Sequence, residues 1–177
     1  TLSSLPGAGW SLSTVDGTVP IDAWLAALST ANTGILYIPT ADLTVGDLSN
    51  AEAAVINTRS AEINAFVGGA GIPANGGGLF AMAQSPDSGV TPYGWLTTLL
   101  PGITITELGG GGEGSPLTLT PDGNTAFPGL TNADLSTGPW HNYFEGDFGG
   151  LKVLATGPES SVTRNVILGR RRHGDRA

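Results

Sequence analysis

The stretch ILYIPTADLTVGDLSNAEAAVINTRSAEINAFVGGAGIPANGGGLFAMA, residues 35–83, carries the clearest structural signals in the chain. Ile35–Ile38 is a continuous apolar run of strand length, which is typical of a strand that is covered on both faces. Ser49–Glu52 has the spacing of a capping box, so a helix begins there and runs to Gly68. Leu79–Ala83 is the next buried strand, so the stretch predicts a strand, a helix and a second parallel strand.

The segments on either side extend this pattern. Pro20–Ser29 has apolar residues at helical steps behind a proline, and Tyr93–Leu100 suggests another helix. Pro121–Asn124 has the composition of a turn. Strand patterns recur in four further segments, which are Ile103–Thr106, Leu117–Thr120, Lys152–Thr156 and Val162–Leu168. Helices that alternate with buried strands predict an α/β fold, a three-layer α/β/α sandwich with right-handed crossovers and a mostly parallel sheet.

Length and charge divide the chain into a body and a tail. The chain has 177 residues, which fits one domain, and we expect that domain to span residues 1–169. Up to Thr163 the chain carries 14 acidic residues against two basic ones, so the charge of this body is near −12. Residues 170–177 are rich in arginine, and a disordered terminus is the expectation for them. A body this acidic repels phosphate backbones, so nucleic acid is excluded as a partner.

Two absences narrow the chemistry and the location. The chain has no cysteine, which removes disulfides, thiolate nucleophiles and cysteine metal sites. It has no apolar run of the roughly 20 residues that a membrane span needs. Its richness in small polar residues, with a single lysine, is typical of an exported bacterial protein, so we expect an extracellular or periplasmic location. The oligomeric state is left open.

Three glycine-rich and aromatic segments carry a resemblance to a known family. They read AFVGGAG at residues 65–71, GGGLFAMAQ at residues 76–84 and PWHNYF at residues 139–144. Together they resemble the class I glutamine amidotransferase-like domains, especially secreted bacterial forms related to the trehalose-utilisation type. The resemblance covers most of the chain and implies a flavodoxin-like sheet.

The chain departs from that family where the chemistry would lie. The family's strand corresponding to Leu79–Ala83 delivers a cysteine nucleophile, whereas this chain continues with Gln84 and Ser85. The late His-x-Glu pair is also missing, because His141 is followed by Asn142 and Tyr143. The glutaminase reaction therefore cannot operate, and the resemblance implies a non-catalytic or degenerate domain.

The segment HNYFEGD, residues 141–147, holds the first candidate site. His141 is the side chain best suited to proton transfer near neutral pH, and with Glu145 and Asp147 it forms a candidate catalytic group. The two carboxylates are also candidate ligands for a metal such as Ca²⁺. The alternative is that His141 is structural and that its aromatic neighbours are packing residues.

A second candidate group follows the strand at Leu79–Ala83. Ser85 is a possible nucleophile for His141 to activate, with an acid such as Asp87 to orient the histidine. Candidate ligand-binding residues are Gln84, Asp87, Trp140 and Tyr143. For the carboxylates the alternative is ordinary turn chemistry.

Two functions follow from these candidates. The first is a non-catalytic, amidotransferase-like module that binds a small-molecule ligand or serves a structural role in an exported bacterial protein. The alternative is a small hydrolase of ester, lactone or amide bonds that uses His141 with Ser85 or nearby carboxylates, with calcium as a candidate cofactor. No other cofactor is expected.

Overall fold

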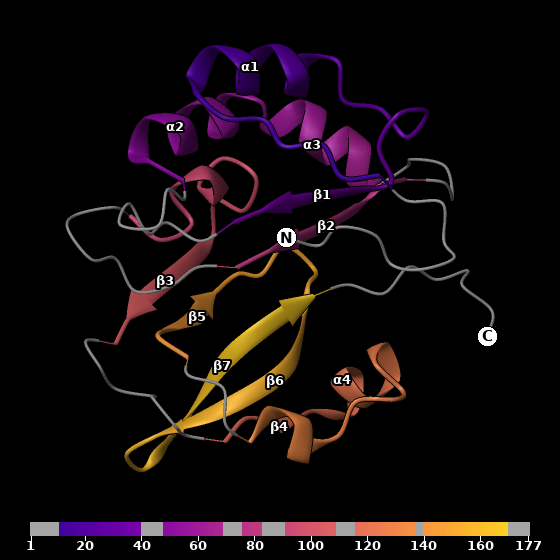
Figure 1. The fold of residues 1–177 in the computed structure, drawn as a ribbon. Helices are drawn as coiled ribbons and strands as arrows, with labels where there is room; N and C mark the ends of the chain where they lie inside the picture. The colour runs from indigo at the N-terminus through magenta and orange to yellow at the C-terminus, as the bar shows by residue number, and fades with distance from the viewer. Residues whose placement is uncertain are drawn as a thin grey trace.

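The computed structural model describes residues 11–39, 48–68, 76–82, 91–108, 116–136 and 140–169. Three helices lie over a two-stranded sheet, and a larger sheet forms the other half of the molecule (Figure 1). The elements run in the order α1 Thr18–Ala26, β1 Ile35–Ile38, α2 Asn50–Thr58, α3 Ser60–Val67, β2 Gly78–Ala81, the 3-10 turn η1 Gly94–Leu96, β3 Ile103–Glu107, β4 Thr118–Leu119, α4 Pro121–Ala126, the 3-10 turn η2 Asn132–Leu135, β5 Asn142–Gly146, β6 Lys152–Glu159 and β7 Val162–Gly169.

The larger sheet overturns the predicted fold class. Its five strands lie in the order β3-β5-β7-β6-β4, and every neighbouring pair is antiparallel. Among the described strands, only β1 and β2 are parallel. The prediction of a three-layer, flavodoxin-like, mostly parallel sandwich is therefore wrong. The reason is the connections: a parallel pair needs a crossover of a dozen or more residues, whereas β6 and β7 are joined by two residues.

The strand–helix–strand unit at residues 35–83 is confirmed in part, because the single helix expected from Ser49 to Gly68 is two helices, α2 and α3, that meet at Arg59. The Ser49 hydroxyl accepts a hydrogen bond from the Glu52 N–H, and the Glu52 carboxylate accepts one from the Ser49 N–H at 2.9 Å. The helical segment predicted to end at Gly68 does so, with that glycine in the left-handed conformation at φ 75°. The β1 and β2 strands pair in parallel, with Tyr37 beside Phe80.

Three other local predictions differ from the structure. Pro121–Asn124 opens the helix α4, because the Thr120 hydroxyl caps its first turn by accepting from the Gly123 N–H. The helix expected over Tyr93–Leu100 is reduced to the short turn η1. Asn142–Gly146, expected to be a loop, is the strand β5 in the middle of the larger sheet. The expected tail at residues 170–177 lies outside the described residues.

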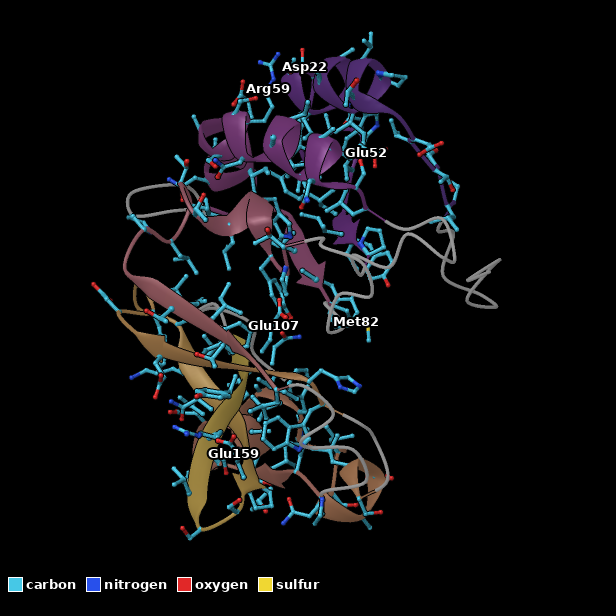
Figure 2. All side chains as sticks on the ribbon, turned by 90° about the vertical axis from the view of Figure 1, so that its left-hand side faces the viewer. Asp22, Glu52, Arg59, Met82, Glu107 and Glu159 are labelled. Atoms are coloured by element: carbon cyan, nitrogen blue, oxygen red, sulfur yellow. The ribbon has the colours of Figure 1, made fainter. Side chains whose placement is uncertain are left out.

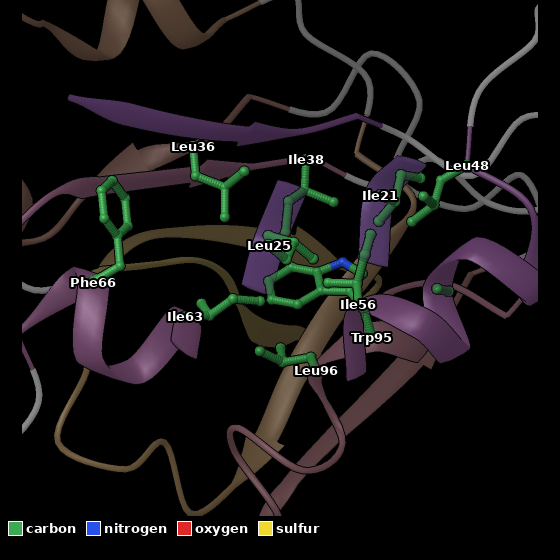
Figure 3. Packing of buried hydrophobic residues seen from close by; sticks show 11 residues of the cluster. Ile21, Leu25, Leu36, Ile38, Leu48, Ile56, Ile63, Phe66, Trp95 and Leu96 are labelled. Carbon is green, nitrogen blue, oxygen red and sulfur yellow. The ribbon is translucent and has the colours of Figure 1, made fainter. Parts of the chain in front are cut away.

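The first hydrophobic core lies between the three helices and one face of β1–β2 (Figure 3). Leu36 and Ile38 point from β1 into this core, where they meet Leu25 of α1 and Ile63 of α3. Ile63 has no exposed surface. Full burial of such a side chain contributes about 1.5–3 kcal/mol, so this core fixes how the helices sit on the small sheet.

The second core belongs to the larger sheet. It gathers around Trp140, Tyr143 and Ala155, with α4 and η2 beside the short strand β4. The β3 strand joins the two cores, since Ile105 packs on the first and Leu108, directly after the strand, belongs to the second. The ring of Tyr93, which packs on the first core, meets the ring of Phe144 in β5 edge to face at 5.4 Å and adds a contact between the first core and the larger sheet.

Polar contacts hold α1 to α2 and α3. Glu52 accepts from the Gly17 N–H at 2.9 Å, which connects the start of α1 to the first turn of α2. Arg59 binds Asp22 of α1 through two hydrogen bonds of 2.7 and 2.8 Å and also reaches Glu62. Figure 2 shows Arg59 and Asp22 side by side at the outside of the helical layer. These contacts align α1 with the two helices that follow.

Burial by itself raises the pKa of Glu52. The hydrogen bonds that its carboxylate accepts from the Ser49 hydroxyl and from the backbone N–H groups of Ser49 and Gly17 outweigh burial, so its pKa lies below the usual value. A lowered carboxyl pKa means that the charged form stabilises the fold. That contribution is complete above the pKa of the unfolded chain, about 4.3, and is lost as the pH falls through the folded value.

We predict that Glu52→Ala lowers the free energy of unfolding by about 2 kcal/mol near neutral pH, because two N–H groups lose their acceptor. Urea unfolding at about pH 7 and about pH 3 measures the loss, which shrinks at the lower pH as the wild-type carboxylate becomes protonated. Asp134→Ala is the matched control, since Asp134 completes a second, exposed capping box with Thr131. An equal loss in both variants would contradict a contribution of Glu52 beyond that of an ordinary capping box.

Candidate functional site

The structure places five of the predicted site residues on or beside β5. Trp140 and His141 precede the strand, Tyr143 and Glu145 lie within it, and Asp147 follows it. The other three, Gln84, Ser85 and Asp87, lie outside the described residues, so the proximity of Ser85 to His141 stays a prediction.

An extended strand separates residues that a loop would bring together. At about 3.3 Å per residue, four steps put His141 and Glu145 about 13 Å apart along the backbone. The His141 carbonyl accepts from the Leu108 N–H at 2.7 Å, which holds it at one end of β3, whereas the Asp147 N–H donates to the Gly102 carbonyl at the other end. His141, Glu145 and Asp147 are therefore spread along the length of β5, where it pairs with β3, and do not gather around one point.

Glu145 faces an arginine across the sheet. Its carboxylate lies 3.3 Å from Nη1 of Arg164 on β7. Arg164 also binds Glu159 at 2.6 Å, and its guanidinium lies 4.3 Å from the centre of the Tyr143 ring. The hydrogen bond to Glu159 is the main cause of a raised Arg164 pKa, which burial partly offsets. Glu145 is thus part of an ion-pair group that joins three strands.

Asp147 takes part in a turn. Its carboxylate accepts from the Gly149 N–H at 2.9 Å, and its backbone N–H is bonded to Gly102. This is the turn chemistry that was the alternative to metal binding. Within the described ranges no three His, Asp or Glu side chains lie close enough together to hold a metal ion. The predicted calcium ligands Glu145 and Asp147 therefore have no third carboxylate or imidazole beside them in this part of the chain.

Trp140 and Tyr143 are interior residues. Trp140 is 4% exposed and Tyr143 is 7% exposed, and both belong to the second core. A Cβ atom on Gly157 would lie 2.7 Å from the Trp140 ring and 2.8 Å from Leu117, so the strand β6 passes tightly against the indole. The burial of these two aromatic residues favours the packing alternative over ligand binding.

One carboxyl group near β5 was not among the predicted site residues. Glu107 ends β3, and burial raises the pKa of its carboxyl. A carboxyl group with a shifted pKa is a candidate functional group. The residue opposite Glu107 in the sheet is Asn142, not His141. The register therefore does not pair His141, as a base, with Glu107 as the acid that orients it.

The surface that sequence reasoning missed is the outward face of β1–β2. Four large apolar side chains lie on it, Ile35 (57% exposed), Tyr37 (44%), Phe80 (56%) and Met82 (48%), and we call this set the open face. The rings of Tyr37 and Phe80 stack at 5.7 Å with an angle of 20° between their planes. Figure 2 shows Met82 on the side of the small sheet that is turned away from the helices. The apolar run at Ile35–Ile38 was the available signal.

The comparisons with known proteins identify no family for this chain. No protein-family model, no curated protein and no solved structure matches it. In the part of the chain that the structure describes, every helix is too short or too polar to pass through a bilayer.

We predict that Gly157→Ala lowers the free energy of unfolding by about 2 kcal/mol, because the added methyl group overlaps Trp140 and Leu117. Urea unfolding followed by tryptophan fluorescence measures the change. Gly129→Ala is the control, since nothing lies within 4 Å of its Cβ position. An unchanged midpoint in Gly157→Ala would show that Trp140 has room to move and would reopen its role as a ligand-binding residue.

We also predict that Arg164→Lys lowers the midpoint of urea unfolding more than Glu145→Gln does. A lysine lacks the planar guanidinium that binds Glu159 and Glu145 together and lies over the Tyr143 ring. Glu145 is 51% exposed and makes the longer of the two ion pairs, so its loss costs less stability. The Arg164→Lys loss decreases in about 1 M salt, which screens ion pairs. A larger loss in Glu145→Gln would contradict this ranking.

Proposed function

We propose that this chain is a non-catalytic binding module of an exported bacterial protein and that its binding surface is the open face of β1–β2. The observation that supports this most directly is the group of four exposed apolar side chains at Ile35, Tyr37, Phe80 and Met82. Contiguous apolar surface of this kind marks interaction sites in soluble proteins. A ligand or partner that is itself apolar is the occupant that such a face favours.

The architecture around the open face supports the same proposal. Parallel strands are ordinarily covered on both faces, and the apolar run at Ile35–Ile38 has the composition of a strand with two covered faces. Helices α1, α2 and α3 cover one face of β1–β2. The opposite face has the apolar residues that are typical of a buried surface, but no described element covers it as the helices cover the first face. A bound partner would cover this face.

The polar residues near β5 support a module without catalysis. Glu145 is engaged with Arg164, Asp147 holds a turn, and Trp140 and Tyr143 are core residues. Each has a structural role that accounts for its presence. The hydrolase alternative stays a prediction, because its nucleophile Ser85 lies outside the described residues. Export is proposed on composition alone.

We predict that the neutral apolar dye Nile red binds the native protein and that Phe80→Ser reduces its fluorescence enhancement at least about threefold, as expected for loss of one aromatic contact. Phe127→Ser is the matched control, since Phe127 is 46% exposed but lies beside α4, away from the open face. Fluorescence titration of the three proteins measures the difference.

Two results would overturn the proposal. Equal dye binding by the wild type and by Phe80→Ser would remove the open face as a binding surface. Turnover of chromogenic esters or lactones that disappears in His141→Ala would make the protein a hydrolase, and dependence of that turnover on calcium would add the metal.

A further inference from the structure

The backbone of β2 has hydrogen-bonding groups that no described strand uses. The Gly78 N–H donates to Gly34 and the Met82 N–H donates to Ile38, so the even-numbered peptide groups of β2 point toward β1. Because successive peptide groups alternate in direction along a strand, those of Gly77, Leu79 and Ala81 point the other way. Within the described residues β2 has one strand neighbour, which is β1.

The first of these outward groups already has a partner. The Gly77 N–H donates to the carbonyl of Phe66, at the end of α3, at 2.6 Å. The helix ends there, and α3 does not reach the groups further along. We call the N–H and C=O groups of Leu79 and Ala81 the β2 edge. It is a row of donors and acceptors with the spacing of a strand, which is a template for pairing.

Burial distinguishes the β2 edge from the outer edge of β1. On the helix-covered face, Leu36 and Ile38 of β1 are buried, whereas Leu79 and Ala81 of β2 are only half-buried. The helices therefore complete the core over β1 and leave it incomplete beside β2. A further strand next to β2 would cover Leu79 and Ala81, whereas a strand next to β1 would cover side chains that are already buried.

We infer that the β2 edge binds an extended strand of a partner polypeptide, which joins the small sheet as its third strand. This inference rests on the proposed function and names the class of partner. Only an extended peptide repeats donors and acceptors at the spacing of Leu79 and Ala81, so main-chain hydrogen bonds provide affinity. The side chains of the strand alternate between the two faces.

Both faces of the small sheet then specify the bound sequence. Side chains directed to the helix face pack on Leu79 and Ala81, which favours branched aliphatic residues. Side chains directed to the open face continue the row formed by Tyr37 and Phe80, which favours aromatic residues. The bound strand is therefore apolar on both faces, as in the middle of a parallel sheet.

Charge selects among possible partners. The body up to Thr163 has a net charge near −12, so it repels acidic segments and a second copy of itself, and it attracts segments with basic flanks. The partner strand is accordingly an apolar segment of another polypeptide with neutral or basic ends.

The test uses a fluorescein-labelled peptide whose central residues alternate valine and phenylalanine between lysine-rich ends. Two further peptides carry N-methyl groups on one or the other alternate set of central residues, which removes the N–H groups from one edge at a time. Fluorescence anisotropy with the wild-type protein is expected to show that one methylated peptide binds like the parent and that the other is weakened at least about tenfold. A peptide with glutamate-rich ends is expected to bind more weakly than the parent.

Two variants locate the binding edge on the protein. Ala81→Pro removes an outward N–H of β2 without touching the bonds to β1, and it is expected to weaken the parent peptide about tenfold. Glu107→Pro is the matched control, because β3 is the end strand of the larger sheet and the Leu108 N–H points to His141, so the Glu107 N–H points away from β5. This variant is expected to leave the affinity unchanged. The methylated peptides give a result on the wild-type protein even where a proline variant fails to fold.

The outcomes separate this inference from the proposed function. No binding of the parent peptide, equal binding of both methylated peptides, or weakening by Glu107→Pro instead of Ala81→Pro would overturn the role of the β2 edge. Sensitivity of Nile red binding to Phe80→Ser would still support the open face in that case. Loss of both effects would overturn the proposed function as well.

Discussion

Glu52 brings one carboxylate to the free N–H groups at the beginnings of two helices, and the arrangement of the helical half follows from that contact. The same side chain accepts from Gly17 before α1 and from Ser49 before α2, and Arg59 repeats the connection through Asp22. With the helices aligned, their apolar sides form one surface for Leu36 and Ile38. A short parallel pair, which is marginal by itself, becomes one wall of a core.

The sequence predicted the helical half better than the sheet half, and the reason is the range over which each signal acts. The capping box at Ser49 and the left-handed end at Gly68 depend on neighbours a few residues away. Strand direction depends on connections and distant partners, so the correct strand positions in β6 and β7 did not reveal that they form a hairpin. The α4 helix was missed because its opening Pro-Asp-Gly also suits a turn.

The candidate site was predicted less well, because the type of a residue does not show whether its role is structural or catalytic. The mixed run at residues 141–147 suggested a loop with an imidazole and two carboxylates, whereas its core is a strand that keeps them apart. Glu145 forms an ion pair with Arg164, which lies 19 residues later, and no local sequence pattern predicts that pair. The open face was visible as an apolar run, but the sequence did not indicate that one side would lack a cover.

The separation of the two cores along the chain bears on how the protein folds as it is synthesised. The first core uses residues from Val15 to Ile105, and the second uses residues from Leu108 to Ile167, so neither encloses a segment of the other. The helical half, with its β1–β2 pair and β3, can therefore collapse before β5 leaves the ribosome. The antiparallel half then adds to β3, which is already held on one side. The order of emergence thus matches the order in which each half can bury its apolar residues.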